Sequence, residues 1–215
     1  CTGFSAADVG YRRLPPPEGV TATDGQKATA VDISWSSVIG VTSYQLFRCS
    51  DSSTGTCSQI GTPPANATGF SDTGADATGT VHHYRLKACN ANGCSDFSAE
   101  DTGYRKLPAP GGVSATDGDF VDKVRISWID VSGETSYQVF RCSGSSTGTC
   151  SQIATPAANA TSYDDTGADA SGTVHHYRLK ACNANGCSDF SAEDTGYRDT
   201  GPLPDTIFSD GFETP

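Results

Sequence analysis

The sequence predicts an all-β protein built from two tandem seven-stranded β-sandwich domains. Residues 14–106 align without a gap with residues 107–199, and about three positions in four are identical. Within each repeat, short runs alternate apolar and polar residues with a period of two, and Gly, Pro, Asn, Asp and Ser separate the runs. No stretch has the apolar spacing of a helix. A repeat of this size can bury its own core, so each is expected to fold as a domain.

The repeat also sets the expected domain boundaries. Residues 1–13 match the end of each repeat, so we expect there the last strand of a preceding, incomplete repeat. Domain 1 then covers 14–106, domain 2 covers 107–199, and 200–215 is a C-terminal tail. Each domain opens with a proline-rich lead, LPPPE or LPAPG, which favours an extended, semi-rigid connection.

Seven segments of domain 1 have the composition of short strands. The expected strands are 19–23, 30–35, 43–49, 58–60, 69–72, 81–89 and 97–104. In the second strand Val31, Ile33 and Trp35 fall on one face, and in the third Tyr44 and Leu46 do the same. Turn residues stand between the segments at regular intervals, which is typical of an all-β sandwich.

Eight of the nine cysteines form a repeated set of four per domain. Members of each pair are close in sequence and separated by turn residues, so each pair is expected to form a disulfide that closes a hairpin loop. The expected pairs are Cys49–Cys57, Cys89–Cys94, Cys142–Cys150 and Cys182–Cys187. Zinc is the competing reading, but neither spacing resembles a zinc knuckle, and adjacent histidines point to opposite strand faces. No metal or cofactor is therefore expected.

The disulfides predict an oxidising compartment, so the chain is expected to be secreted or to lie at the cell surface. Each bridge would stabilise its domain by about 2–3 kcal/mol in the chain-entropy model. Cys1 stands where Cys94 and Cys187 stand in the repeats, and it is expected to be unpaired within this chain. A preceding repeat, a lipidated N-terminus and an intermolecular disulfide each account for Cys1.

The order of motifs resembles a known family. Each repeat has a Pro-rich lead, a Trp in the second strand, a Tyr in the third, and the run Tyr-x-Leu-x-Ala-Cys-Asn-x-x-Gly-Cys-Ser. This order resembles the fibronectin type III domain, an immunoglobulin-like sandwich, in the form common in bacterial secreted proteins. The matching residues are Trp35, Tyr44, Tyr84, Leu86, Ala88, Asn90, Gly93 and Ser95, and in domain 2 Trp128, Tyr137, Tyr177, Leu179, Ala181, Asn183, Gly186 and Ser188. The local disulfides depart from most of the family.

Composition and motifs narrow the possible activities. The net charge of −11 repels phosphate backbones, so no nucleic-acid partner is expected. No apolar run reaches membrane-spanning length. The sequence contains no recognisable motif that pairs a nucleophile with a base, so the chain is not expected to be an enzyme. The Asp-rich turns at 72–76 and 164–169 could hold calcium, although their composition is equally that of ordinary turns. Asn66 and Asn159 begin N-glycosylation sequons.

One surface is a candidate interaction face. The resemblance makes the third and sixth strands neighbours, with a set of polar, basic and aromatic residues facing outward. This set is Gln45, Phe47, His83, Arg85 and Lys87, and in domain 2 Gln138, Phe140, His176, Arg178 and Lys180. An exposed aromatic on a basic stripe could form a contact. The alternative is a solvated sheet face whose aromatic lies under long side-chain stems.

These features predict a non-catalytic extracellular structural protein, a rigid array of sandwich domains in a stalk or filament. The expected partners are copies of the chain, associated head to tail through the N-terminal segment, or another extracellular protein or polysaccharide. The resemblance also allows an accessory, spacer or carbohydrate-binding region of a secreted hydrolase.

Overall fold

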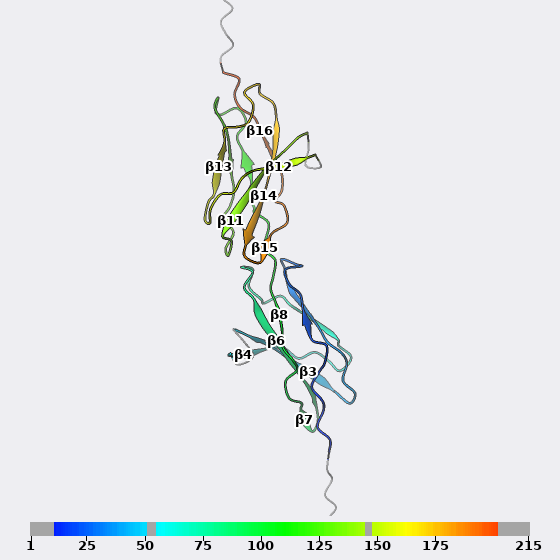
Figure 1. The fold of residues 1–215 in the computed structure, drawn as a ribbon. Helices are drawn as coiled ribbons and strands as arrows, with labels where there is room; N and C mark the ends of the chain where they lie inside the picture. Colours follow the sequence, from blue (N-terminus) through cyan, green and yellow to red (C-terminus); the bar gives the residue numbers. More distant parts are fainter. Residues whose placement is uncertain (1–10, 51–54, 145–147, 202–215) are drawn as a thin grey trace, which may run out of the picture. The chain divides into compact units, whose positions relative to one another are not determined.

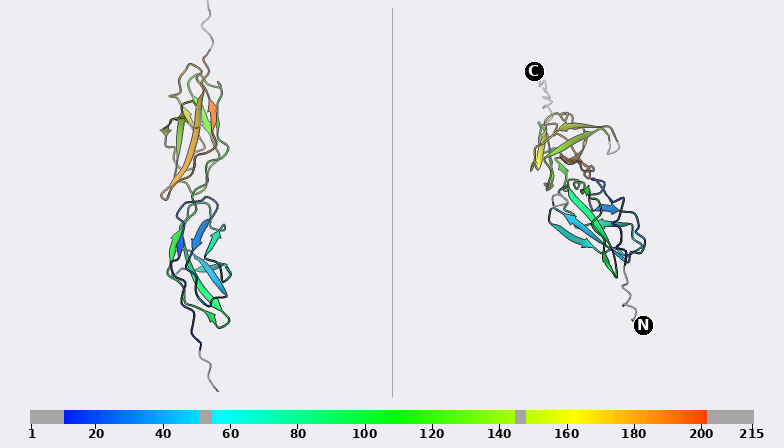
Figure 2. Two further views of the ribbon diagram at one scale, coloured as in Figure 1. Left: turned by 90° about the vertical axis from the view of Figure 1, so that its right-hand side faces the viewer. Right: turned by 60° about the horizontal axis from the view of Figure 1, so that its bottom comes forward.

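The computed structural model of this chain describes residues 11–50, 55–144 and 148–201 (Figure 1). Cys1, most of the N-terminal segment and nearly all of the tail lie outside these ranges. The chain divides between Leu107 and Pro108 into two compact units, domain 1 and domain 2. The described ranges contain strands and loops, and Figure 2 gives two further views of them. No helix in them is long and apolar enough to cross a membrane.

Each domain contains a three-stranded and a five-stranded antiparallel sheet. In domain 1 the sheets have the orders β1-β2-β5 and β4-β3-β6-β7, with β8 also pairing with β6. Its strands are β1 Thr21–Ala22, β2 Val31–Ser34, β3 Ser43–Cys49, β4 Cys57–Gly61, β5 Gly69–Asp72, β6 His82–Asn90, β7 Gly93–Cys94 and β8 Asp101–Gly103. Domain 2 repeats them as β9 Ser114–Ala115, β10 Val124–Ser127, β11 Ser136–Cys142, β12 Cys150–Ala154, β13 Ser162–Asp165, β14 His175–Asn183, β15 Gly186–Cys187 and β16 Asp194–Gly196. The all-β sandwich prediction is confirmed.

Of the predicted seventh strand, 97–104, only β8 at Asp101–Gly103 is regular. A short strand outside the predicted bounds, β7, precedes it, and the segment between β7 and β8 is irregular. Two serines of this segment pair with β6 through their side chains. The amide of Ala88 donates to Ser95 Oγ at 3.0 Å, and the amide of Leu86 donates to Ser98 Oγ at 3.0 Å. The serine amides donate in turn to the carbonyls of Ala88 and Leu86. Hydroxyls thus replace the carbonyls of a regular ladder, which explains why continuous strand pairing stops here.

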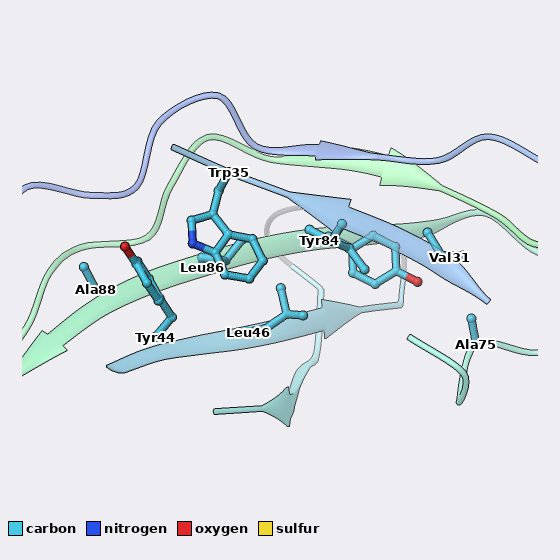
Figure 3. Packing of buried hydrophobic residues seen from close by; sticks show 9 residues of the cluster. Val31, Trp35, Tyr44, Leu46, Ala75, Tyr84, Leu86 and Ala88 are labelled. Atoms are coloured by element: carbon cyan, nitrogen blue, oxygen red, sulfur yellow. The ribbon is translucent and has the colours of Figure 1, made fainter. Parts of the chain in front are cut away.

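The core lies between the two sheets and is built from the alternating residues (Figure 3). Tyr44, Leu46, Tyr84 and Leu86 are completely buried, and Trp35 is 4% exposed. The rings of Trp35 and Tyr44 meet edge to face, with centroids 5.3 Å apart. Burial of each large apolar side chain contributes about 1.5–3 kcal/mol. The equivalent residues form the core of domain 2, with Val139 in place of Leu46.

A buried polar network closes one end of this core. Asp72 is 3% exposed and its Oδ2 accepts hydrogen bonds from Arg48 Nη1 at 2.8 Å and Tyr84 Oη at 3.0 Å. Its Oδ1 accepts from the amide of Gly74. Burial, followed by the charge of Asp72, raises the pKa of Tyr84 well above its usual range. The network links β3, β5 and β6, so it ties the two sheets together.

Gly103 allows the last strand to pass close to the first. A Cβ at this position would lie 2.8 Å from Val31 Cγ1 and 2.9 Å from both Ala22 Cβ and the Thr23 carbonyl. Two of these neighbours are backbone or Cβ atoms that cannot rotate away. Gly196 meets the same crowding in domain 2. A glycine is therefore required where β8 packs against β1.

Candidate interaction surface

The candidate face lies on the side of the five-stranded sheet that points away from the core. Strand β3 pairs with β6 so that Gln45 is opposite Lys87, Phe47 is opposite Arg85, and Cys49 is opposite His83. Directly opposed residues in an antiparallel pair share one face. Strands β11 and β14 bring Gln138, Phe140, His176, Arg178 and Lys180 together with the same register.

A second phenylalanine, absent from the predicted set, lies at the centre of this face. The rings of Phe47 and Phe97 meet edge to face with centroids 5.0 Å apart. The Arg85 guanidinium lies 4.3 Å from the Phe97 centroid and Lys87 Nζ lies 4.2 Å from it. Both distances are within the range of cation–π attraction. The six residues Gln45, Phe47, His83, Arg85, Lys87 and Phe97 are called the outer face of domain 1.

Domain 2 repeats this cluster. Phe140 and Phe190 meet with centroids 5.0 Å apart, and Arg178 and Lys180 lie 4.1 and 4.3 Å from the Phe190 centroid. The outer face of domain 2 is Gln138, Phe140, His176, Arg178, Lys180 and Phe190.

Both rings of each outer face are half-buried, not exposed. Phe47 and Phe97 have intermediate accessibility because the rings cover one another and the two cations cover Phe97. The expectation of an exposed aromatic is therefore wrong, and the alternative with the ring under long side chains describes the surface. Phe97 is absent from the predicted set because it lies on the irregular segment between β7 and β8. The alternation of a regular strand does not determine which face a side chain takes there. The outward surface is formed by the cations and amides that cover the rings.

A histidine–glutamate pair borders each outer face. His83 Nδ1 lies 2.7 Å from Glu100 Oε1, and His176 Nδ1 lies 2.8 Å from Glu193 Oε1. The neighbouring serines are already engaged, since Ser95 Oγ accepts the Ala88 amide and donates to the Asp96 carbonyl at 2.7 Å. The contacts of these groups are structural: they fix the irregular segment against β6.

The disulfides join directly opposed residues of adjacent strands. Cys49 and Cys57 connect β3 to β4, and Cys89 and Cys94 connect β6 to β7, each with a Cα–Cα distance of 4.0 Å. Domain 2 contains the equivalent bridges Cys142–Cys150 and Cys182–Cys187. All four are the pairs expected from spacing. They staple two hairpins of the sheet that carries the outer face.

The acidic turns are engaged within the protein. Asp72 is buried against Arg48, whereas Asp76 accepts from the Thr78 hydroxyl and lies 3.1 Å from His82 Nε2. No group of three or more His, Cys, Asp or Glu side chains that could hold a metal occurs in the described parts of the chain. The sequon residues Asn66 and Asn159 are exposed in the connections β4–β5 and β12–β13.

Comparison with solved structures decides the fold. A segment of two fibronectin type III domains from chicken tenascin superimposes with a TM-score of 0.59 at 20% identity, covering 83% of this chain and 97% of that segment. Both domains have the fibronectin type III fold. An Fn3-like protein from Clostridium thermocellum is 31% identical over 45% of this chain and 96% of its own, with a TM-score of 0.38.

Sequence comparison gives a more limited result for these fibronectin type III domains. No protein-family model matches the chain. A poly(3-hydroxybutyrate) depolymerase from Delftia acidovorans is 39% identical over 80 residues, which is 37% of this chain. The match spans only 14% of that enzyme's length.

Proposed function

We propose that this chain is a non-catalytic extracellular spacer, in which fibronectin type III domains stabilised by local disulfides support or separate other parts of a secreted assembly. The observation that carries the proposal is the duplication of one stapled sheet. In each domain, two bridges join strands within the five-stranded sheet, and a buried Arg–Asp–Tyr network joins that sheet to the other. Such redundancy favours persistence outside the cell, where oxidising conditions preserve disulfides and proteases are abundant.

The engagement of the reactive side chains supports a non-catalytic role. Catalysis requires a nucleophile or base free to meet a substrate in a shaped site. Ser95 and Ser98 are buried and bond to backbone groups, and His83 is paired with Glu100. The polar groups of the candidate face thus support the fold or form an open surface.

A second role, as an accessory region of a secreted polymer hydrolase, is supported by the similarity to the depolymerase. The 80 matched residues are close to the length of one repeat and cover a small fraction of the enzyme. A match of this size is what a shared module beside a separate catalytic domain produces.

The filament form of the structural role depends on residues 1–13. The described end of this segment contacts domain 1, because Arg13 Nε donates to the Cys94 carbonyl at 3.1 Å and Nη2 lies 2.9 Å from Asp96. Sedimentation velocity over a wide concentration range tests the head-to-tail proposal. Concentration-dependent growth that disappears on deleting residues 1–13 supports it, whereas an intact chain that stays monomeric excludes it.

The non-catalytic role is tested with the purified, oxidised chain. We expect no turnover of ester, glycoside or peptide substrates, and we expect resistance to thermolysin that is lost when the disulfides are reduced. Turnover that vanishes on replacing His83 or Ser95 contradicts the non-catalytic assignment. Equal proteolysis of the oxidised and reduced chains contradicts the stabilising role of the bridges.

A further inference from the structure

The two sheets of each domain differ in how far the repeats have diverged. In the five-stranded sheet, the only strand positions that differ are Leu46, which is Val139 in domain 2, and Gly61, which is Ala154. Leu46 is buried in the core, and a Cβ on Gly61 would point at the Phe70 ring. Every residue of the outer face is identical in the two domains, including Phe97 and Phe190, which lie between strands.

The three-stranded sheet has changed at half of its strand positions. The changes, domain 1 to domain 2, are Thr21 to Ser114, Asp32 to Arg125, Gly69 to Ser162, Phe70 to Tyr163 and Ser71 to Asp164. One of them reverses a charge. Both sheets have existed since the same duplication, so its age does not explain why one exterior changed and the other did not. Packing in the core does not explain the identity of the outer face, because its residues point away from the core. The contacts of the rings and cations with one another account for part of it.

The chemistry of the outer face defines what it can bind. Arginine and lysine side chains donate hydrogen bonds and accept none, and Arg85 and Lys87 are gathered on one phenylalanine ring. Gln45 adds an amide beside them, and the partly exposed ring edges add apolar surface. A matching ligand presents mainly oxygen acceptors next to hydrocarbon, because the cations of the face outnumber the single amide oxygen of Gln45. Two identical faces in tandem suit a ligand that repeats, because linked sites gain avidity on a polymer.

We propose that the two outer faces bind an aliphatic polyester, with Arg85, Lys87, Arg178 and Lys180 donating hydrogen bonds to ester carbonyls and the phenylalanine edges contacting the hydrocarbon. A neutral polymer avoids the repulsion that a chain of net charge −11 exerts on polyanions. Ester units offer acceptors without donors, unlike the hydroxyls of neutral polysaccharides. This inference rests on the accessory role proposed above and names the substrate class that the module would contact.

The test is binding of the oxidised chain to poly(3-hydroxybutyrate) granules in the presence of blocking protein. Alginate beads and cellulose serve as anionic and neutral polysaccharide probes. We expect retention on the polyester and about tenfold weaker apparent binding when Arg85→Ala, Lys87→Ala, Arg178→Ala and Lys180→Ala are combined, because both linked sites are lost. A milder pair, Lys87→Gln with Lys180→Gln, leaves both guanidiniums in place and should weaken binding by a smaller factor.

A charge-matched control separates the outer face from general electrostatics. Arg85→Ala with Lys87→Ala removes two positive charges from the outer face of domain 1, and Arg12→Ala with Lys27→Ala removes two from elsewhere in the same unit. We expect only the first pair to reduce binding, with circular dichroism confirming that each variant is folded. Equal losses in the two pairs, preferential binding to alginate or cellulose, or no binding to the granules overturns the inference. Absence of granule binding leaves the protease and turnover tests of the spacer role unaffected.

Discussion

The two domains share a buried network but build different polar networks on their surfaces. In domain 1, Asp32 on β2 lies 2.5 Å from Lys27 Nζ and accepts from Ser71 on β5. In domain 2 the surface carboxylate is on β13 instead of β10. Asp164 on β13 pairs with Arg125 and Lys123 at 2.7 and 2.8 Å. The buried Arg–Asp–Tyr network is unchanged. The partly exposed charges have therefore changed position while the fold persists, whereas the buried aspartate is the same in both domains.

A second difference concerns one connection. Glu134 of domain 2 is 9% exposed and its Oε1 accepts the Asn159 amide at 2.7 Å. Asn159 has φ 61°, a left-handed conformation that L-residues seldom adopt. Domain 1 has Val41 and Asn66 at these positions, and Asn66 is not left-handed. The buried carboxylate thus accompanies a backbone conformation that domain 1 does without.

The largest expected effect is equal in the two domains. Asp72→Ala removes the acceptor of Arg48 and Tyr84, and Asp165→Ala does the same for Arg141 and Tyr177. Each change leaves a partly buried cation unpaired and should cost its domain about 3 kcal/mol. Hydrogen exchange measures both, because β2 and β10 differ in sequence and report the domains separately. A loss confined to one domain would contradict the equivalence of the networks.

The second effect should appear in domain 2 alone. Glu134→Val installs the residue of domain 1 and leaves the Asn159 amide without its carboxylate acceptor, which should cost about 1–2 kcal/mol. Adding Asn159→Gly relieves the left-handed backbone and should recover part of the loss. Hydrogen exchange in β10 and β13 gives the measurement. Unchanged protection would show that the carboxylate does not support this turn.

Acid should destabilise the two domains by different amounts, and this difference should be smaller than the effects of the substitutions above. The hydrogen bonds from Arg125 and then Lys123 hold the pKa of Asp164 well below its usual range, and those from Lys27 and then Ser71 lower the pKa of Asp32. A lowered folded-state pKa gives stability that is present above the unfolded value, about pH 4, and is lost as pH falls through the folded value. Domain 2 should therefore lose more stability than domain 1 below about pH 4. Asp164→Asn should reverse the order, because domain 1 keeps the contribution of Asp32. The stability of each domain, measured by hydrogen exchange of its own strands at a series of pH values, tests this.

The smallest effect is expected from exchanging the surface networks. Arg125→Asp combined with Asp164→Ser gives domain 2 the residues of domain 1 at both positions. Because the side chains of this network keep contact with solvent, stability near pH 7 should change by less than about 0.5 kcal/mol. A larger change in the denaturation midpoint would mean that the surface pairs matter as much as the buried network.

Alternation and turn residues were sufficient to predict the sandwich, because residues such as Ile33 and Tyr84 point inward wherever the period of two holds. The prediction was incomplete where side chains replace backbone partners. Ser95 and Ser98 break the ladder, and no period reveals that Phe97 then turns onto the outer face. The partners of Asp72 were equally hidden, since Arg48 and Tyr84 meet it only after two sheets pack. Cysteine spacing gave the bridges because both partners lie within one hairpin.

The disulfides also determine how an unfolded domain responds to tension. The bridges of domain 1 span sequence separations of only 8 and 5 residues. An extended chain spans about 3.3–3.6 Å per residue, so a domain pulled open by its ends would still release most of its contour length, while the two stapled hairpins would remain as small closed loops. These loops preserve the strand pairs on which refolding can begin. A domain unfolded by tension would therefore lengthen, and it would keep two closed hairpins from which it can refold when the tension is released.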